Sequence, residues 1–305
     1  MFEQTIRSSV EFSGVGLHSG APVSMRILPA PSGTGILFRR TDLDRFEVEA
    51  VGRNVAKVSY ATSLMKKGVL ISTTEHLLSA FIGTAIDNAI VEIDNLELPI
   101  LDGSALPYLK RFSEVGLRQQ RRRRSYMKIK EPVEVREGDK FIGVYPHSSY
   151  RVEYAIQFPH PLIQEQKYSV EIRGECYAQE IAPARTFGFL SDEKKLRDMG
   201  LIRGANEENA IVLTPEGVKN GPLRFADEFV RHKVLDLIGD LALLGHHLLG
   251  RVVADRAGHA MHIALVTKLL RDHTLWEPVT LTGRGHEQQA AQIPGALPLS
   301  AESHA

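Results

Sequence analysis

Cysteine is almost absent from this sequence of 305 residues, because Cys176 is the only one. The chain therefore has neither a disulfide framework of its own nor a zinc site built from several thiolates. Net charge is absent as well, since 37 acidic residues balance 37 basic ones, and no overall field draws the protein to nucleic acid or to an anionic membrane. A metal ion in this protein would need histidine and carboxylate ligands.

Long apolar runs are also missing. Each apolar stretch is interrupted by charge or is too short to span a bilayer, and residues 1–7 lack the basic and then apolar pattern of a secretory signal. We therefore expect a cytoplasmic, globular protein with no transmembrane segment. The length allows one large domain or two domains of ordinary size, each with a core of its own.

The chain divides into two halves of similar organisation, each of which begins with strand-like segments and ends with helices. Residues 1–116 form the first half, with a helix predicted over 73–82 and a buried strand over 89–93. Residues 127–276 form the second half, in which several strands precede and separate helical segments, the last of them predicted over 258–270. This order predicts an α+β protein with two similarly built domains.

Two segments fall outside these domains. Residues 117–126 include four consecutive arginines, Arg121–Arg124, and this composition predicts an exposed, arginine-rich linker. Contact with phosphates or acidic lipid is the alternative, although no aromatic residues are interleaved to stack on bases. Residues 277–305 are rich in Gly, Pro, Gln and Ser without periodicity, which predicts a mobile tail.

A glycine-rich loop covers residues 13–20, between strands predicted over 10–12 and 23–28. It resembles a phosphate cradle in composition, but it lacks the lysine of a P-loop and the glycine spacing of a dinucleotide-binding loop. Turn geometry is therefore the better explanation of these glycines.

The most informative segment is a predicted helix around residues 231–240. His232, Asp236 and Asp240 stand at positions i, i+4 and i+8 and share one face, while apolar residues surround the helix on nearly every side. Carboxylates in such a buried helix need a metal ion, a cation or a proton nearby, because an unpaired buried charge costs several kcal/mol. His-x-x-x-Asp is also a natural pair of metal ligands. The structural alternative is a core polar network in which Asp236 pairs with a neighbouring lysine or arginine.

A carboxylate and an imidazole are adjacent at the start of the helix predicted in the first half, at Glu75 and His76. Adjacent side chains on a helix diverge by about 100 degrees, so these two cannot chelate one ion from the same face. One can bind a metal while the other reaches a ligand beside it. The alternative is a capping box, in which Glu75 pairs with the backbone at Ser72.

Two further elements offer polar groups. His259 lies at a probable helix start, where a charged imidazole needs a carboxylate partner, and Asp240 is a candidate for that role. Thr186 offers a hydroxyl beside the rings of Phe187 and Phe189, although an edge strand with core phenylalanines explains the same pattern.

Together these residues supply the parts needed for metal-assisted amide hydrolysis. One zinc ion per chain would have three protein ligands and an open position for water, with the ligands drawn from His76, His232 and Asp236. Glu75 would be the general base, and His259, held protonated by Asp240, would stabilise the oxyanion or protonate the leaving amine. Thr186 would donate a further hydrogen bond to the tetrahedral oxygen. Helical spacing points Lys233 away from the metal face and towards substrate.

Five motifs closely resemble one family, the UDP-3-O-acyl-N-acetylglucosamine deacetylases, which are zinc amidases of lipid A biosynthesis in Gram-negative bacteria. The motifs occur in the family's order, at residues 71–77, 100–104, 184–188, 232–240 and 258–259. The resemblance implies two α+β domains, each a helix pair packed on small sheets, with the metal site in the interdomain cleft. It also implies hydrolysis of the N-acetyl amide of UDP-3-O-(3-hydroxyacyl)-N-acetylglucosamine, with release of acetate.

The resemblance assigns the same roles to the zinc ligands, to Glu75 as base and to His259 with its supporting Asp240. It adds Phe187 and Lys233 as substrate-contacting residues, and it places an apolar passage for the acyl chain within residues 193–211. We expect a monomer that works close to the membrane surface and does not bind nucleic acid. The alternatives are an amidase for another acylated amino sugar and a structural or RNA-associated protein that uses Arg121–Arg124.

Overall fold

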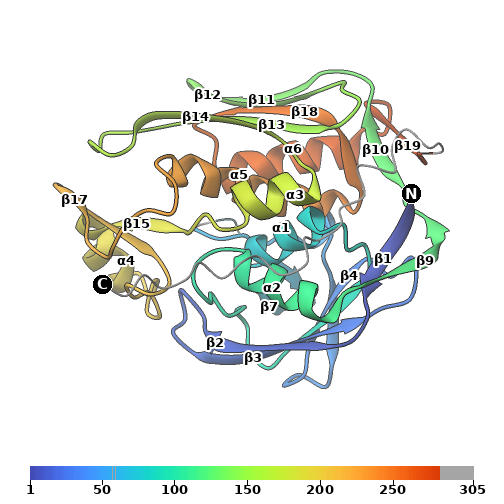
Figure 1. Ribbon diagram of the computed structural model, residues 1–305, viewed down its shortest axis with the longest axis horizontal. Coiled ribbons are helices and arrows are strands. Elements are labelled where there is room, and N and C mark those ends of the chain that lie inside the picture. Colours follow the sequence, from blue (N-terminus) through green and yellow to red (C-terminus); the bar gives the residue numbers. More distant parts are fainter. Residues whose placement is uncertain (57, 59, 282–305) are drawn as a thin grey trace, which may run out of the picture.

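The computed structural model describes residues 1–56, 58 and 60–281, and it has four layers (Figure 1). A sheet from the first half forms one outer layer and a sheet from the second half forms the other. Between them lie two layers of helices. The first contains α1 (Glu75–Gly83) and α2 (Leu106–Val115), and the second contains α5 (Glu228–Leu241) and α6 (His259–Arg271). The predicted α+β architecture, with a helix pair on each sheet, is confirmed.

The sheet of the first half has five strands in the order β2-β3-β8-β4-β5. Alternate residues of β3 are buried, as expected for a strand with one face on a core. The predicted strand over 89–93 is present as β8. The bounds are β2 (Val10–Val15), β3 (Pro22–Pro29), β4 (Ile36–Arg40), β5 (Phe46–Glu49) and β8 (Ala89–Ile93), with a separate hairpin of β6 (Leu64–Lys66) and β7 (Val69–Ile71) and a 3-10 turn at Gly52–Asn54.

The sheet of the second half has seven strands, and β18 lies at its centre, hydrogen-bonded to β10, β12 and β13. Its strands are β10 (Tyr126–Ile129), β11 (Val133–Glu137), β12 (Lys140–Tyr145), β13 (Tyr150–Phe158), β14 (Gln164–Glu171), β18 (His247–Asp255) and β19 (Trp276–Val279). A small third sheet and several short helical segments precede α5. They are α3 (Gly174–Cys176), β15 (Phe187–Phe189), α4 (Glu193–Asp198), β16 (Ile211–Thr214) and β17 (Gly217–Val218), with single turns at Tyr177–Ile181 and Leu190–Asp192. A further single turn at Ala242–Leu244 follows α5 directly.

The predicted linker is a strand. β9 (Leu117–Arg123) pairs antiparallel with β1 (Phe2–Ile6), and most of its side chains are exposed as expected, but Arg124 is buried against Asp87. The long arginine side chains allow this, because their stems can pack while their charged ends reach water or a partner. The guanidinium of Arg123, for instance, lies 5.1 Å from the centre of the Phe2 ring.

The predicted tail begins too early in the sequence. Glu277 pairs with Lys128 within the β10–β19 ladder, so β19 belongs to the second sheet rather than to a tail. Trp276 packs against the core, and its indole nitrogen donates to the carbonyl of Leu269 at 2.8 Å. Residues 282–305 of the predicted tail lie outside the described residues.

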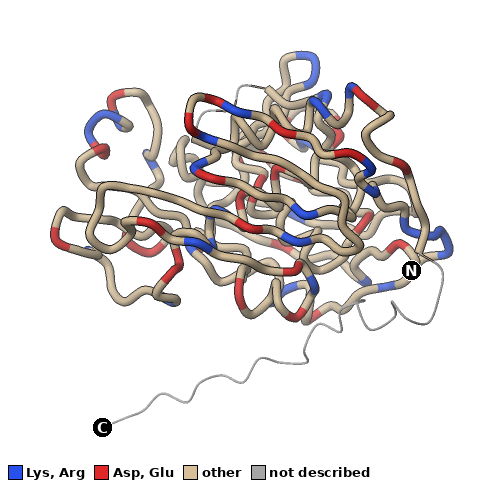
Figure 2. The backbone as a smooth tube through the Cα atoms, turned by 90° about the horizontal axis from the view of Figure 1, so that it is seen from above, with Lys and Arg blue, Asp and Glu red and all other residues tan. Residues whose placement is uncertain are grey.

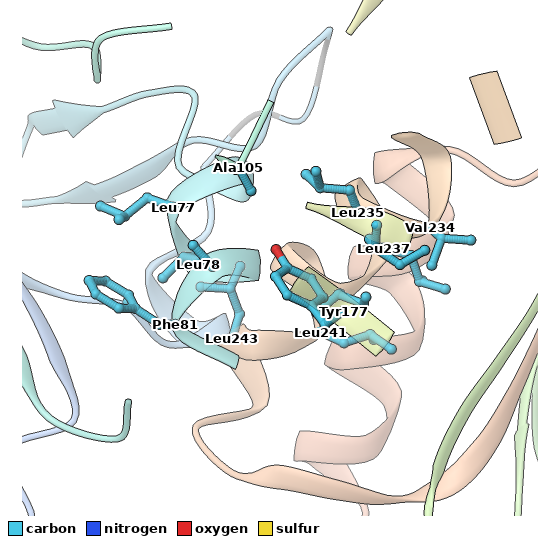
Figure 3. Packing of buried hydrophobic residues seen from close by; sticks show 14 of the residues in the cluster. Leu77, Leu78, Phe81, Ala105, Tyr177, Val234, Leu235, Leu237, Leu241 and Leu243 are labelled. Atoms are coloured by element: carbon cyan, nitrogen blue, oxygen red, sulfur yellow. The ribbon is translucent and has the colours of Figure 1, made fainter. Parts of the chain in front are cut away.

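The core joins the two helix layers. Leu77 and Phe81 of α1 point away from α5, and Phe81 stacks on Phe112 of α2, while Leu235, Leu237 and Leu241 of α5 lie on the other side of α1 in the same buried cluster (Figure 3). Close contact depends on Gly239, because a Cβ atom there would lie 2.0 Å from the carbonyl oxygen of Glu75. Glycine in α5 therefore brings the first turn of α1 against the polar face of α5.

Charge is distributed over the whole fold. Lys and Arg positions are interspersed with Asp and Glu positions along the chain (Figure 2), in keeping with the zero formal net charge. Within the described residues, no helix combines the length and apolar character that crossing a bilayer requires.

Candidate metal centre and active site

Three buried side chains meet where α1 contacts α5. His76 comes from the first turn of α1, and His232 and Asp236 come from successive turns of α5. Oδ1 of Asp236 lies 3.6 Å from Nε2 of His76 and 3.4 Å from Nε2 of His232. The three predicted metal ligands therefore converge, with one potential ligand atom from each within 4.8 Å of the others.

The protonation of this cluster suits a metal ion. Burial lowers the pKa of His232 to about 3, which keeps its ring neutral, and Nδ1 of that ring lies 3.0 Å from the carbonyl of Ala184. The ring proton is thereby held on Nδ1, and the lone pair of Nε2 faces Asp236. Burial opposes the charge of Asp236, but Lys233 and His232 lower the pKa of its carboxyl well below the usual value. A neutral imidazole and an ionised carboxylate are both groups that bind zinc.

Lys233 does not point away from the metal ligands, so that prediction was wrong. Its ammonium group donates to Oδ2 of Asp236 at 2.8 Å, and Asp236 raises the pKa of Lys233 even though burial opposes its charge. The reason is that residues three apart are neighbours on a helix and the four-carbon stem of lysine reaches back along the surface. The same ammonium lies 5.6 Å from the centre of the Phe187 ring, which also packs edge-on to His232.

Glu75 lies beside the three ligands rather than among them. Its Oε2 accepts the backbone N–H of Thr62 at 3.1 Å, and its Oε1 lies 3.9 Å from Nε2 of His259. The hydroxyl of Ser72 instead meets that of Ser63, so Glu75 does not form the capping box considered as an alternative. Burial raises the pKa of Glu75, which brings the carboxylate closer to the proton affinity of a general base.

His259 and Asp240 form the predicted pair. Nδ1 of His259 lies 2.7 Å from Oδ2 of Asp240, and its Nε2 faces Glu75 and Asp236. Burial disfavours an imidazolium, but the charge and the hydrogen bond of Asp240 raise the pKa of His259 to about 9. At neutral pH, His259 therefore carries two ring protons, one directed to Asp240 and one directed to the space beside Glu75.

Thr186 lies in a segment that joins the two halves. Its backbone N–H donates to the carbonyl of Gly103, and its own carbonyl accepts the N–H of Ile211, both at 2.8 Å. The neighbouring Arg185 donates to the fully buried Glu228 at the start of α5. These contacts bring the motif at 100–104 to the motif at 184–188. The catalytic role of the Thr186 hydroxyl stays a prediction.

The glycine-rich loop is a turn, as predicted. Glu97 accepts the backbone N–H of His18 at 2.9 Å and that of Ser19 at 2.7 Å, and it also accepts the hydroxyl of Thr73. The amides that a phosphate cradle would need are therefore committed to a buried carboxylate. Gly16 is required here because a Cβ atom would lie 2.3 Å from the Glu97 carboxylate.

Sequence reasoning missed three residues around Asp240. The hydroxyl of Thr62 donates to Oδ1 of Asp240 at 2.5 Å, and Nδ1 of His262 lies 2.8 Å from Oδ2. Tyr154 contacts the other nitrogen of His262 at 3.0 Å. A signal existed for His262, because it stands three residues after His259 and therefore on the same helix face. Thr62 and Tyr154 are remote in sequence and gave none.

Comparison with known proteins gives one consistent result. A family model described as UDP-3-O-acyl N-acetylglycosamine deacetylase matches residues 3–271. The chain is 52% identical over 297 residues to the UDP-3-O-acyl-N-acetylglucosamine deacetylase of Solibacter usitatus, covering 97% of this chain and 99% of that protein. Proteins of the same name from Geotalea uraniireducens and Myxococcus xanthus are 41% identical over 299 residues and 43% identical over 295 residues, with at least 94% of either chain covered in both cases.

Proposed function

The chain belongs to the UDP-3-O-acyl N-acetylglycosamine deacetylase family, and we propose that it removes the N-acetyl group of UDP-3-O-acyl-N-acetylglucosamine by zinc-dependent hydrolysis. This family was the one predicted from the sequence motifs. The observation that supports the zinc-dependent mechanism is the convergence of two imidazoles and one carboxylate beside a second carboxylate and a further histidine. The reaction is one step of lipid A biosynthesis.

His76, His232 and Asp236 would hold the zinc ion. Three protein ligands with an open position are typical of catalytic rather than structural zinc sites. A zinc ion bound there would act as a Lewis acid towards the amide carbonyl and would lower the pKa of water. Lys233 would keep the second oxygen of Asp236 paired, so that only Oδ1 of this carboxylate is directed to the two imidazoles.

Glu75 would act as the general base. Its carboxylate is anchored through Oε2 to the amide of Thr62, which leaves Oε1 directed towards the space shared with His259. The pKa raised by burial makes Glu75 a better acceptor for the proton of an attacking water. Its Oε1 atom, which would take this proton, lies 3.9 Å from Nε2 of His259, the group that would protonate the leaving nitrogen.

His259 would be the general acid and the oxyanion-stabilising group. Asp240 holds its Nδ1 proton, so the Nε2 proton is directed to the reacting centre, and this proton would pass to the amine as the C–N bond breaks. Thr186 would donate to the same oxyanion. Phe187 and Lys233 would contact the substrate, since the ring and the ammonium lie side by side at the edge of the site.

The test is release of acetate from UDP-3-O-acyl-N-acetylglucosamine by the purified full chain. Activity should disappear after treatment with a chelator and return on addition of one equivalent of zinc. A parallel assay with UDP-N-acetylglucosamine, which has no 3-O-acyl chain, distinguishes this substrate from other amino sugars. Turnover that survives complete removal of metal would overturn the zinc mechanism, and equal rates on both substrates would overturn the substrate assignment.

A further inference from the structure

One carboxylate oxygen of Asp240 accepts hydrogen bonds from two histidines. Nδ1 of His259 lies 2.7 Å and Nδ1 of His262 lies 2.8 Å from the same Oδ2, while Thr62 donates its hydroxyl to Oδ1. Asp240 is fully buried, so these three side chains provide its visible hydrogen-bond donors. An ionised carboxylate only accepts, and each of the two imidazoles must therefore carry a proton on Nδ1.

The two histidines differ in what their other nitrogen meets. Nε2 of His259 faces Glu75 and Asp236 in the reacting space, whereas Nε2 of His262 lies 3.0 Å from the hydroxyl of Tyr154. That hydroxyl also lies 2.6 Å from the carbonyl of Ala257, just before α6 begins. His262 is therefore fixed from both sides, and at 1% exposure it has no access to substrate.

We propose that His262 is a positioning residue for the deacetylation reaction, which holds the Asp240 carboxylate in the plane that orients His259. This inference rests on the proposed function of His259. A carboxyl group rotates easily about its last side-chain torsion, because that torsion has a broad, roughly two-fold energy profile. Two N–H donors on one oxygen and a hydroxyl on the other leave Asp240 a single orientation, and His259 then keeps its Nδ1 proton towards Asp240 and its Nε2 proton towards the substrate.

The geometry of α6 makes this arrangement possible. His259 and His262 are three residues apart, so both rings project from one face of the helix towards α5, and their centres lie 6.0 Å apart. Tyr154 donates its hydroxyl to the carbonyl of Ala257, two residues before α6 begins. Strand β13, helix α5 and helix α6 are thereby connected through one buried hydrogen-bonded chain that runs from Tyr154 to His262, Asp240 and His259.

Two substitutions of nearly equal shape separate the hydrogen bond from packing. His262→Asn keeps an N–H donor where Nδ1 stood, and His262→Leu has the same branching without a donor. With the zinc-loaded enzyme, we expect kcat to fall about 10- to 100-fold in His262→Leu and to stay within about threefold of wild type in His262→Asn. KM, zinc content and the melting temperature should be similar in the two variants. Equal kcat values in the Asn and Leu variants would overturn the proposal.

A second measurement does not depend on turnover. In protein with 15N-labelled histidine, the Nδ1 proton of His259 should give a downfield, slowly exchanging NMR signal because it is bonded to a buried carboxylate. We expect this signal in wild type and in His262→Asn and its broadening or loss in His262→Leu. An unchanged signal in all three proteins would overturn the positioning role. If wild type shows the signal but releases no acetate, the proposed function fails while the positioning of His259 by His262 stands.

Discussion

Two clusters of histidine and carboxylate, one around Asp236 and one around Asp87, differ in how their charges are paired. At the junction of α1 and α5, one oxygen of Asp236 faces two imidazole nitrogens and the other is bonded to Lys233. At the end of α1, Asp87 accepts from both the guanidinium of Arg124 and the amide of Gln4, at 2.7 to 2.8 Å, and His247 lies 3.3 Å away.

The difference lies in the balance of donors and lone pairs. Around Asp87, donors fill both oxygens, and Arg124 supplies a permanent charge, so the cluster is a closed ion pair within the fold. Around Asp236, one potential ligand atom from each of three side chains lies within 4.8 Å of the others. Both clusters thus hold charged groups away from water, and the convergence of several potential ligand atoms is the feature that favours a metal site at Asp236.

The largest effect is expected from removing one of the proposed zinc ligands in the Asp236 cluster. His232→Asn should lose stoichiometric zinc and lower kcat/KM about 1,000-fold or more, because Lewis-acid catalysis supplies several kcal/mol. His247→Asn is the matched control in the other cluster, and it should retain zinc and turnover while lowering the melting temperature. Metal analysis and the acetate assay measure both variants. Retention of tightly bound zinc by His232→Asn would contradict the ligand assignment.

A second prediction distinguishes a catalytic carboxylate from a structural one. Glu75→Gln should keep its zinc but lose about 100- to 10,000-fold in kcat, since an amide cannot take the proton of the attacking water. Asp87→Asn makes the same kind of change in the closed cluster and should leave kcat unchanged. The measurement is steady-state turnover per bound zinc. A Glu75→Gln variant that loses its metal would show that Glu75 belongs to the zinc ligands instead.

Local patterns sufficed for the metal face of α5 and for much of the fold. The periodicity of a helix places His232, Asp236 and Asp240 on one buried face. The strand β8 likewise occupies the residues that its local apolar pattern predicts. The structure brings these residues to His76 and Glu75, but that depends on the contact between α1 and α5 at Gly239, which no local pattern shows.

Tertiary partners explain the remaining differences. Composition predicted a solvated linker from the arginine run, yet its last member, Arg124, pairs with Asp87, which lies 37 residues earlier in the chain. Thr62 and Asp240 are separated by 178 residues. Such pairs arise only when the strands and helices are assembled. The contact of Lys233 with Asp236 is different, because residues three apart are neighbours on a helix and the sequence alone places them together.

The smallest expected effect is a loss of folding stability at low pH, caused by protonation of Asp87. Burial alone would raise the pKa of Asp87, but His247 and Arg124 lower it to about 2, compared with 3.8 for an unperturbed carboxyl. A carboxyl with a lowered pKa in the folded state stabilises the fold above pH 3.8, and this stabilisation is lost as the pH falls towards 2. The difference corresponds to about 2 kcal/mol in the free energy of unfolding.

Asp87→Asn removes this titration while leaving the metal site intact. Between pH 5 and pH 2, the free energy of unfolding of wild type should therefore fall by about 2 kcal/mol more than that of Asp87→Asn, as measured by urea denaturation at each pH. All other carboxylates titrate in both proteins, so the difference between the two curves isolates Asp87. If the free energies of unfolding of the two proteins fall in parallel with pH, Arg124 does not hold Asp87 ionised. The Asp87 cluster would then not be the fully paired ion pair with which the Asp236 cluster is compared.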